Sequence, residues 1–143
     1  MAKLETSVVI NRPISEVFAF VADISNNVKW QTGVVASGFT SSGPVGVGST
    51  FKYDAEIIGR KMEPTGELSA YDPPNKTAWK SNSGPFPMSG STTSEAVEGG
   101  TLVTDRIEAE PSGFFKLAEP LLMKQMQGQS QNDLKKLKAI LES

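Results

Sequence analysis

The 143-residue chain contains no cysteine and no histidine. Without cysteine there is no disulfide framework and no thiolate nucleophile. Without histidine the chain lacks the commonest general base, the commonest zinc ligand and any serine–histidine nucleophile pair. We therefore expect no cofactor and no metal site, although a site built from carboxylates alone stays open.

The sequence also lacks a basic excess and a long apolar run. Its net charge is −2 and its pI is about 5.2, so little positive charge is available to offset phosphates, and we expect no nucleic-acid partner. No run approaches the ~20 apolar residues of a membrane span, and the first residues do not resemble a signal peptide. We expect one domain over residues 1–143, cytoplasmic, as a monomer or homodimer.

The first quarter of the chain predicts one strand and two short helices. Residues 3–11 alternate between apolar and polar side chains, which is typical of a strand with one buried face. Pro13 follows at a position where a helix can begin. A second helical stretch is expected over residues 24–31, and it contains Trp30.

From residue 34 onwards the pattern changes to period two, with Gly and Pro at the breaks. It predicts six further strands, at residues 34–40, 50–58, 60–71, 76–82, 86–98 and 101–110. Pro64 lies inside one of them, so we expect an edge, a bulge or a bend there. Turn signals about every ten residues without crossover helices predict an antiparallel meander. Such a sheet twists and curls.

The C-terminal segment, residues 112–143, predicts a long helix. Apolar residues recur at three- and four-residue steps and form one stripe. Pro120 either kinks this helix or begins its regular part, which would leave residues 114–119 as a separate short turn. A sheet that curves around the apolar stripe would enclose a cavity, and we expect the helix to contact a ligand from Leu117 to Leu122, Leu121 included.

Five motifs, in this order and spacing, carry a family resemblance: INRPISEVFAFVADISNNVKWQTGV, GPVGVGSTF, YDPPNKTAWKS, EGGTLVTDRIEAEPSGFF and the closing LAEPLLMKQM…NDLKKLKAILES. Together they resemble the START/Bet v 1-like (SRPBCC) superfamily, within its bacterial polyketide cyclase/dehydrase-like branch, over nearly the whole chain. The resemblance implies an α+β helix-grip fold, in which a curved antiparallel sheet of about seven strands wraps around a long C-terminal helix, with two short helices after the first strand.

The resemblance also implies a function class. Members of this superfamily bind or act on apolar small molecules such as polyketides, lipids, sterols and quinones, in an elongated cavity between sheet and helix. The family has no universal catalytic residues, so the resemblance implies the fold firmly and the activity only loosely.

Several side chains are candidates for lining such a cavity. Trp30 and Trp79 either line it or belong to the ordinary core. Phe51 and Tyr53 share the inward phase of the strand over residues 50–58, and a buried phenol needs a hydrogen-bond partner. The remaining candidates are Phe86 and Met88, which would form a compliant mouth or a plug, and the hydroxyl side chains Thr77, Ser81, Thr92 and Ser94.

Asp105 is the most informative charged residue. It shares the inward phase of Val103 and Ile107, where a carboxylate is costly unless it is paired or hydrogen-bonded. Burial would raise its pKa, as a general base requires. The alternatives are a strand end that faces solvent, or a bulge that places Arg106 inside instead.

Three functions follow as hypotheses. The first is binding of a small apolar molecule, with or without chemistry. The second is an enzyme of the cyclase, dehydratase or isomerase kind, with Asp105 or Tyr53 as the acid or base. The third is a protein-interaction module, which would require an exposed apolar patch.

Overall fold

The computed structural model describes residues 2–57, 59–84 and 86–143. The last residue of the strand expected over 50–58 and one residue of the turn after Ser83 therefore lie outside the described residues. Five helical segments are present in these ranges: α1 (Ile14–Ala22), a 3-10 turn (Ile24–Asn26), α2 (Asn27–Trp30), α3 (Phe114–Leu117) and α4 (Glu119–Glu142).

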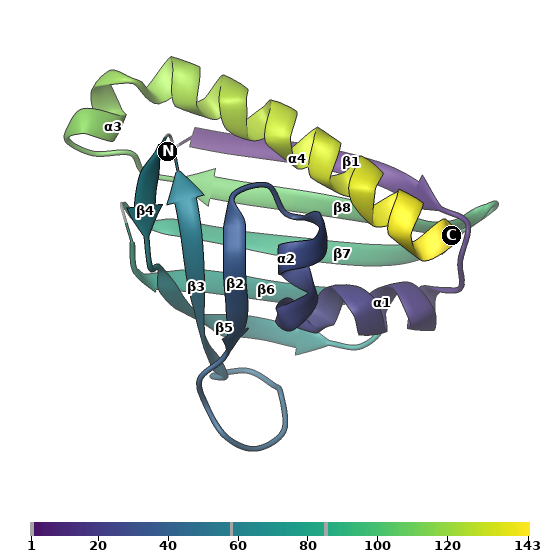
Figure 1. The fold of residues 1–143 in the computed structure, drawn as a ribbon. Coiled ribbons are helices and arrows are strands. Elements are labelled where there is room, and N and C mark those ends of the chain that lie inside the picture. Colours follow the sequence, from purple (N-terminus) through teal and green to yellow (C-terminus); the bar gives the residue numbers. More distant parts are fainter. Residues whose placement is uncertain (1, 58, 85) are drawn as a thin grey trace.

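The strands of the described ranges form one antiparallel sheet in the order β1-β8-β7-β6-β5-β3-β2, with β4 paired to β3. Their bounds are β1 (Ala2–Ile10), β2 (Val34–Phe39), β3 (Thr50–Ile57), β4 (Arg60–Met62), β5 (Thr65–Asp72), β6 (Lys76–Ser83), β7 (Met88–Val97) and β8 (Gly100–Ala109). The sheet curls, and α4 lies along its concave side (Figure 1). This is the helix-grip arrangement that the resemblance implied.

Pro64 divides one predicted strand into two. The expected strand over residues 60–71 is β4 followed by β5, and Pro64 lies between them. The C-terminal part of β3 pairs with β4, whereas its first three residues pair with β5. Because proline has no N–H to donate to a ladder, the chain bends at this point, as the sequence indicated.

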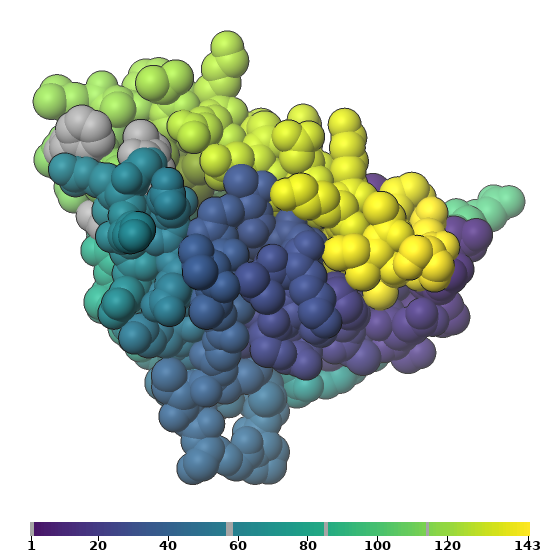
Figure 2. Space-filling model, viewed as in Figure 1, coloured from purple at the N-terminus to yellow at the C-terminus, as the bar shows by residue number. Residues whose placement is uncertain are grey.

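The C-terminal half of α4 covers a closed apolar core. Leu134, Leu137 and Leu141 of the helix are buried against Ile10 of β1 and Val103 of β8. Each fully buried leucine contributes about 1.5–3 kcal/mol relative to exposure. Figure 2 shows this half of the helix lying tightly against the segment that carries α1 and α2.

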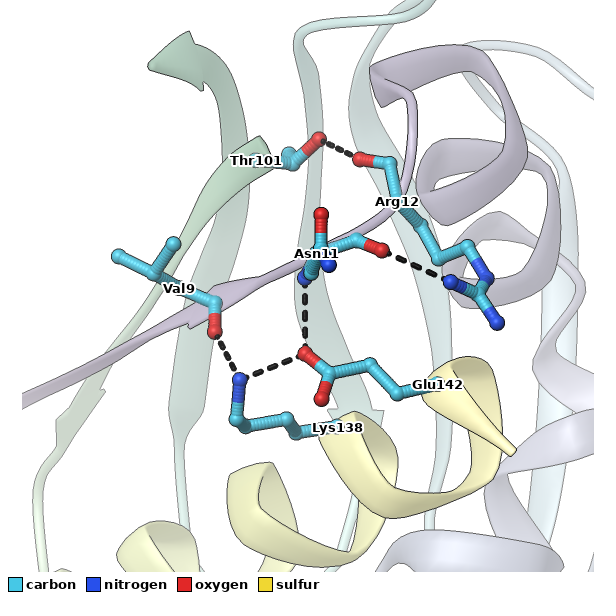
Figure 3. Close-up of polar contacts among 6 residues, drawn as sticks. All are labelled: Val9, Asn11, Arg12, Thr101, Lys138 and Glu142. Atoms are coloured by element: carbon cyan, nitrogen blue, oxygen red, sulfur yellow. Dashed lines mark hydrogen bonds and ion pairs between the residues drawn. The ribbon is translucent and has the colours of Figure 1, made fainter. Parts of the chain in front are cut away.

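Hydrogen bonds fasten the same end of α4 to the corner between β1 and α1 (Figure 3). Lys138 Nζ donates to the carbonyl oxygen of Val9 at 2.8 Å and contacts the Glu142 carboxylate at 2.6 Å. The Asn11 backbone N–H also donates to Glu142, at 2.8 Å. This end of the helix is therefore fixed by both packing and polar contacts.

Pro120 begins the regular part of the long helix. Residues 114–117 form the separate short turn α3, and α4 starts at Glu119. Pro120 then occupies the first turn of α4, where a missing N–H has no cost because that group lacks an intrahelical partner in any case.

Candidate ligand cavity

A cavity of about 280 Å³ lies under the N-terminal half of α4. Its walls come from α2, from α4 and from the inner faces of β3, β5, β6, β7 and β8. The exposed side chains of Thr32, Glu56 and Gln125 are among its lining residues, so the cavity reaches the surface between α4 and the edge of the sheet. Its volume is just below the roughly 300–1,000 Å³ that is usual for small-molecule sites.

Two aromatic rings of the wall each lie over a glycine. A Cβ at Gly90 would come within 2.8 Å of the Trp79 indole, its cross-strand partner. A Cβ at Gly66 would come within 2.5 Å of the Phe51 ring. A Cβ would also meet a backbone carbonyl oxygen, that of Arg106 at Gly90 and that of Lys80 at Gly66, so both positions require glycine. Both Phe51 and Trp79 line the cavity, which for Trp79 is one of the two positions that the sequence left open.

Tyr53 places a hydroxyl group at the cavity wall. Its ring is 5.5 Å from that of Phe51, and its hydroxyl oxygen accepts a hydrogen bond from Asn27 Nδ2 of α2. Burial raises the pKa of Tyr53 to about 12, and the nearby Asp105 carboxylate acts in the same direction. The phenol is therefore protonated at physiological pH and keeps its own O–H hydrogen to donate.

Two buried polar atoms of α2 have no partner among the described residues. They are Asn27 Oδ1, an acceptor, and Trp30 Nε1, a donor. Both residues line the cavity, and their exposed fractions are only 4% and 3%. An unpaired buried polar group costs about 1–3 kcal/mol. Sequence reasoning identified Trp30 but missed Asn27, which has no apolar pattern to mark it.

Asp105 faces the cavity and Arg106 does not. In the sheet Asp105 lies between Thr6 of β1 and Thr92 of β7. Thr92 Oγ1 donates to one carboxylate oxygen at 3.4 Å, and Ser130 Oγ of α4 donates to the other at 3.4 Å. The guanidinium of Arg106 lies on the opposite face, 3.3 Å from the Glu5 carboxylate. No bulge interrupts β8 at this point, so strand alternation decides the orientation.

The surroundings of Asp105 weaken its acidity. Burial raises its pKa to about 6, the Asp133 carboxylate adds to the rise, and the hydrogen bonds from Thr92 and Ser130 oppose it. A carboxyl group with this pKa is half-ionised near pH 6 and mostly ionised at pH 7, and a pKa this close to neutrality suits a general base.

Asp133 joins α4 to the chain between α2 and β2. Its Oδ1 accepts from the backbone N–H of Thr32 at 3.0 Å and from the Thr32 hydroxyl. Lys136 Nζ is 4.0 Å from the same oxygen. Burial raises the pKa of Asp133, while these hydrogen bonds and Lys136 counteract that rise. The sequence did not indicate this contact, because 101 positions separate the two residues.

The far end of the cavity is apolar. Phe86 and Met88 line it together with Leu122 and Met126. The Phe86 ring lies edge-on to Phe115, with centroids 5.1 Å apart. Of the candidate hydroxyl residues Thr77, Ser81 and Thr92 line the cavity, whereas Ser94 is buried elsewhere in β7.

Two predicted cavity positions are wrong. Leu117 is 88% exposed and Leu121 is 66% exposed, and neither lines the cavity. The break between α3 and α4 separates Leu117 from the inner stripe, which starts at Leu122 and continues through Met126 to Ser130. The part of the helix that faces the cavity is therefore residues 122–133 rather than 117–122.

A single long helix held in a curled antiparallel sheet, with a cavity between the two, defines the helix-grip fold. In agreement with this fold, residues 1–142 match the model of a family described as polyketide cyclase/dehydrase and lipid transport, and the chain belongs to that family. No curated protein matches the sequence. No helix of the described ranges is both long and apolar enough to cross a bilayer.

Solved structures with the same fold are distant in sequence. A protein from Thermus thermophilus is 20% identical with a TM-score of 0.84, over 98% of this chain and 97% of that one. The Zhui aromatase/cyclase from Streptomyces sp. R1128 is 15% identical with a TM-score of 0.79, over 99% and 93% of the two chains. A START superfamily protein from Mycobacterium smegmatis is 12% identical with a TM-score of 0.80, over 98% and 97%. At these identities the likeness concerns the fold alone.

Proposed function

We propose that this protein binds a small, largely apolar molecule in the cavity under α4. The observation that carries the proposal is the cavity itself, about 280 Å³ in volume, with aromatic and aliphatic walls and a few polar groups gathered near Asp105 and Tyr53. Binding sites for small molecules have this composition. The family described as polyketide cyclase/dehydrase and lipid transport is consistent with such a ligand.

A neutral fluorescent probe, N-phenyl-1-naphthylamine, tests this proposal. We expect its emission to rise on binding, and we expect an Ala55→Phe variant to lose at least tenfold in affinity, because Ala55 lines the cavity. The matched control is Val35→Phe, which adds a ring at a position that is 69% exposed. Equal binding by both variants would place the probe outside the cavity and contradict the proposal.

A second candidate function is acid–base catalysis on the bound molecule. It is favoured by the Asp105 carboxylate, whose pKa of about 6 suits proton transfer near neutral pH, and by the neighbouring protonated Tyr53. A base of this kind removes a proton next to a carbonyl group, and a phenol can stabilise the developing oxyanion. The Zhui aromatase/cyclase shares the fold, but the proposal rests on these two side chains.

The catalytic candidate is tested by following exchange of the α-protons of 2-tetralone in D₂O by NMR. We expect exchange above the buffer rate, increasing with pH around an apparent pKa near 6. Asp105→Asn should reduce that rate to the buffer level. If 2-tetralone binds and its exchange rate is the same with and without protein, the acid–base role is contradicted for this ketone while ligand binding stands.

A further inference from the structure

The charged side chains that line the cavity all have the same sign. Within the described ranges they are Glu56, Asp105 and Asp133, and no lysine or arginine joins them. A cavity with only carboxylates has a negative potential, which attracts cations and repels anions. The negative lining therefore favours a cationic ligand over an anionic one, which the apolar walls alone do not indicate.

Asp105 is the one of these three carboxylates that is both enclosed and uncompensated. Asp133 already has Lys136 at 4.0 Å and bonds from Thr32, and Glu56 is exposed. From the described part of the chain Asp105 receives only the two 3.4 Å bonds from Thr92 and Ser130. An ionised carboxylate can accept about four hydrogen bonds. Its oxygens therefore have unused capacity on the cavity side.

The cavity also holds two buried polar atoms that have no partner among the described residues, the acceptor Asn27 Oδ1 and the donor Trp30 Nε1. Asn27 is 4% exposed. Three aromatic side chains, Phe51, Tyr53 and Trp79, line the same cavity. Aromatic faces attract cations by about 0.5–2 kcal/mol when the contact is desolvated. A carboxylate, an amide acceptor and aromatic rings are the surroundings that suit an ammonium group.

We propose that the ligand of this cavity is a small organic amine, bound in its protonated form. Its N–H groups donate to Asp105, and its apolar body lies on the Phe51 and Trp79 rings and toward Phe86 and Leu122. The inference rests on the proposed binding function and adds the charge of the ligand. It disfavours carboxylates and phosphate esters, because each would bring a second negative charge close to Asp105.

The proposal includes a dependence on pH. The titratable groups near Asp105 are Asp133 on α4 and Tyr53 on β3, and the hydroxyls of Thr92 and Ser130 are its other polar neighbours. The free protein holds Asp105 ionised above about pH 6. Amine affinity is then constant from about pH 7 to 8.5 and falls as the pH drops below 6, approaching tenfold per unit, because a proton competes with the ammonium for the carboxylate.

The test uses three naphthalene derivatives that differ only in the polar group: 1-naphthylmethylamine, 1-naphthalenemethanol and 1-naphthoic acid. Each displaces N-phenyl-1-naphthylamine from the intact protein at pH 7.5. We expect the amine to bind at least tenfold more tightly than the acid and several-fold more tightly than the alcohol. Asp105→Asn should remove the preference for the amine over the alcohol. The charge-matched control is Glu5→Gln, because Glu5 is exposed on the outer face beside Arg106.

The outcomes separate this inference from the proposal on which it rests. Equal or tighter binding of the acid overturns the amine inference, as does a preference for the amine that survives in Asp105→Asn. Tighter binding of the alcohol overturns it too and indicates a neutral hydroxyl ligand, while the binding function stands. If the neutral probe and all three derivatives fail to bind, both proposals fail.

Discussion

The two halves of α4 lie on the same sheet, but the C-terminal half closes an apolar core and the N-terminal half borders a cavity. From Leu134 to Leu141 the inward residues are leucines, and they close a core without a gap. From Leu122 to Asp133 the inward residues include Met126, Gln129 and Ser130, and they border a cavity. The leucine half also packs against side chains of α1 and α2, among them Val17, Val21 and Trp30. The two halves therefore differ both in their own inward side chains and in the elements that help to fill the space.

The largest effect is expected when one leucine is removed from the filled half of α4, residues 134–141. Leu137→Ala should lower the free energy of unfolding by about 2–5 kcal/mol, because it opens a cavity in a core where the side chain is fully buried. Met126→Ala lies in the hollow half of α4, residues 122–133. It should lower the free energy of unfolding by less than half of that amount, because the Met126 side chain already borders empty space. Urea unfolding followed by tryptophan fluorescence measures both. Equal costs would mean that the two halves are packed alike.

The next largest effect is expected at Asp105 of β8, whose carboxylate faces the cavity under the N-terminal half of α4. The pKa of Asp105 in the folded protein, about 6, lies above the ordinary value of 3.8, so ionisation of this group opposes folding. The stability that it contributes is therefore greatest at low pH and is lost as the pH rises from about 4 to 6. Asp105→Asn should therefore stabilise the protein at pH 8 by on the order of 2 kcal/mol. The gain should shrink toward zero at pH 4, and a gain independent of pH would contradict the assignment.

A smaller effect is expected from Tyr53→Phe. The change removes the oxygen that accepts from Asn27 Nδ2 and leaves a second polar atom of Asn27 without a partner, at a cost of about 1 kcal/mol. Tyr71→Phe is the matched control, because no hydrogen bond of the Tyr71 hydroxyl is found in the described part of the chain. Thermal unfolding should separate the two variants. A control that loses as much as Tyr53→Phe would show that the Asn27 bond is not the cause.

The smallest effect is expected at Gly128, in the middle of the hollow half. A Cβ there would meet nothing within 4 Å, and the residue is exposed within α4. Gly128→Ala should raise stability by about 0.5–1 kcal/mol, because alanine loses less backbone freedom on forming a helix. The same variant should slow probe binding in stopped-flow experiments if α4 bends there to admit a ligand. A loss of stability would indicate that the glycine has a packing role.

Much of this architecture could be predicted from local patterns. Strand alternation put Asp105 in the inward phase but left a bulge with Arg106 inside as an alternative, which the regular β8 decides, and Pro64 and Pro120 marked the two breaks. The errors came from long-range geometry. The break at Ala118 separates Leu117 from the inner stripe, and within α4 it is Leu122 that faces the sheet, which leaves the adjacent Leu121 exposed. The Asp133–Thr32 bond and the glycines under Phe51 and Trp79 depend on neighbours that only the folded chain brings together.

The pairing of β1 with β8 has a consequence for how the protein folds. Ala2 pairs with Ala109, and Ile10 pairs with Thr101, so the first strand finds its neighbour only across nearly a hundred residues of chain. Contacts this distant in sequence slow folding, because the loop must close before any of them forms. During synthesis β1 remains unpaired until β8 has left the ribosome. The cavity, which α4 covers, can therefore be completed only after α4 has been synthesised.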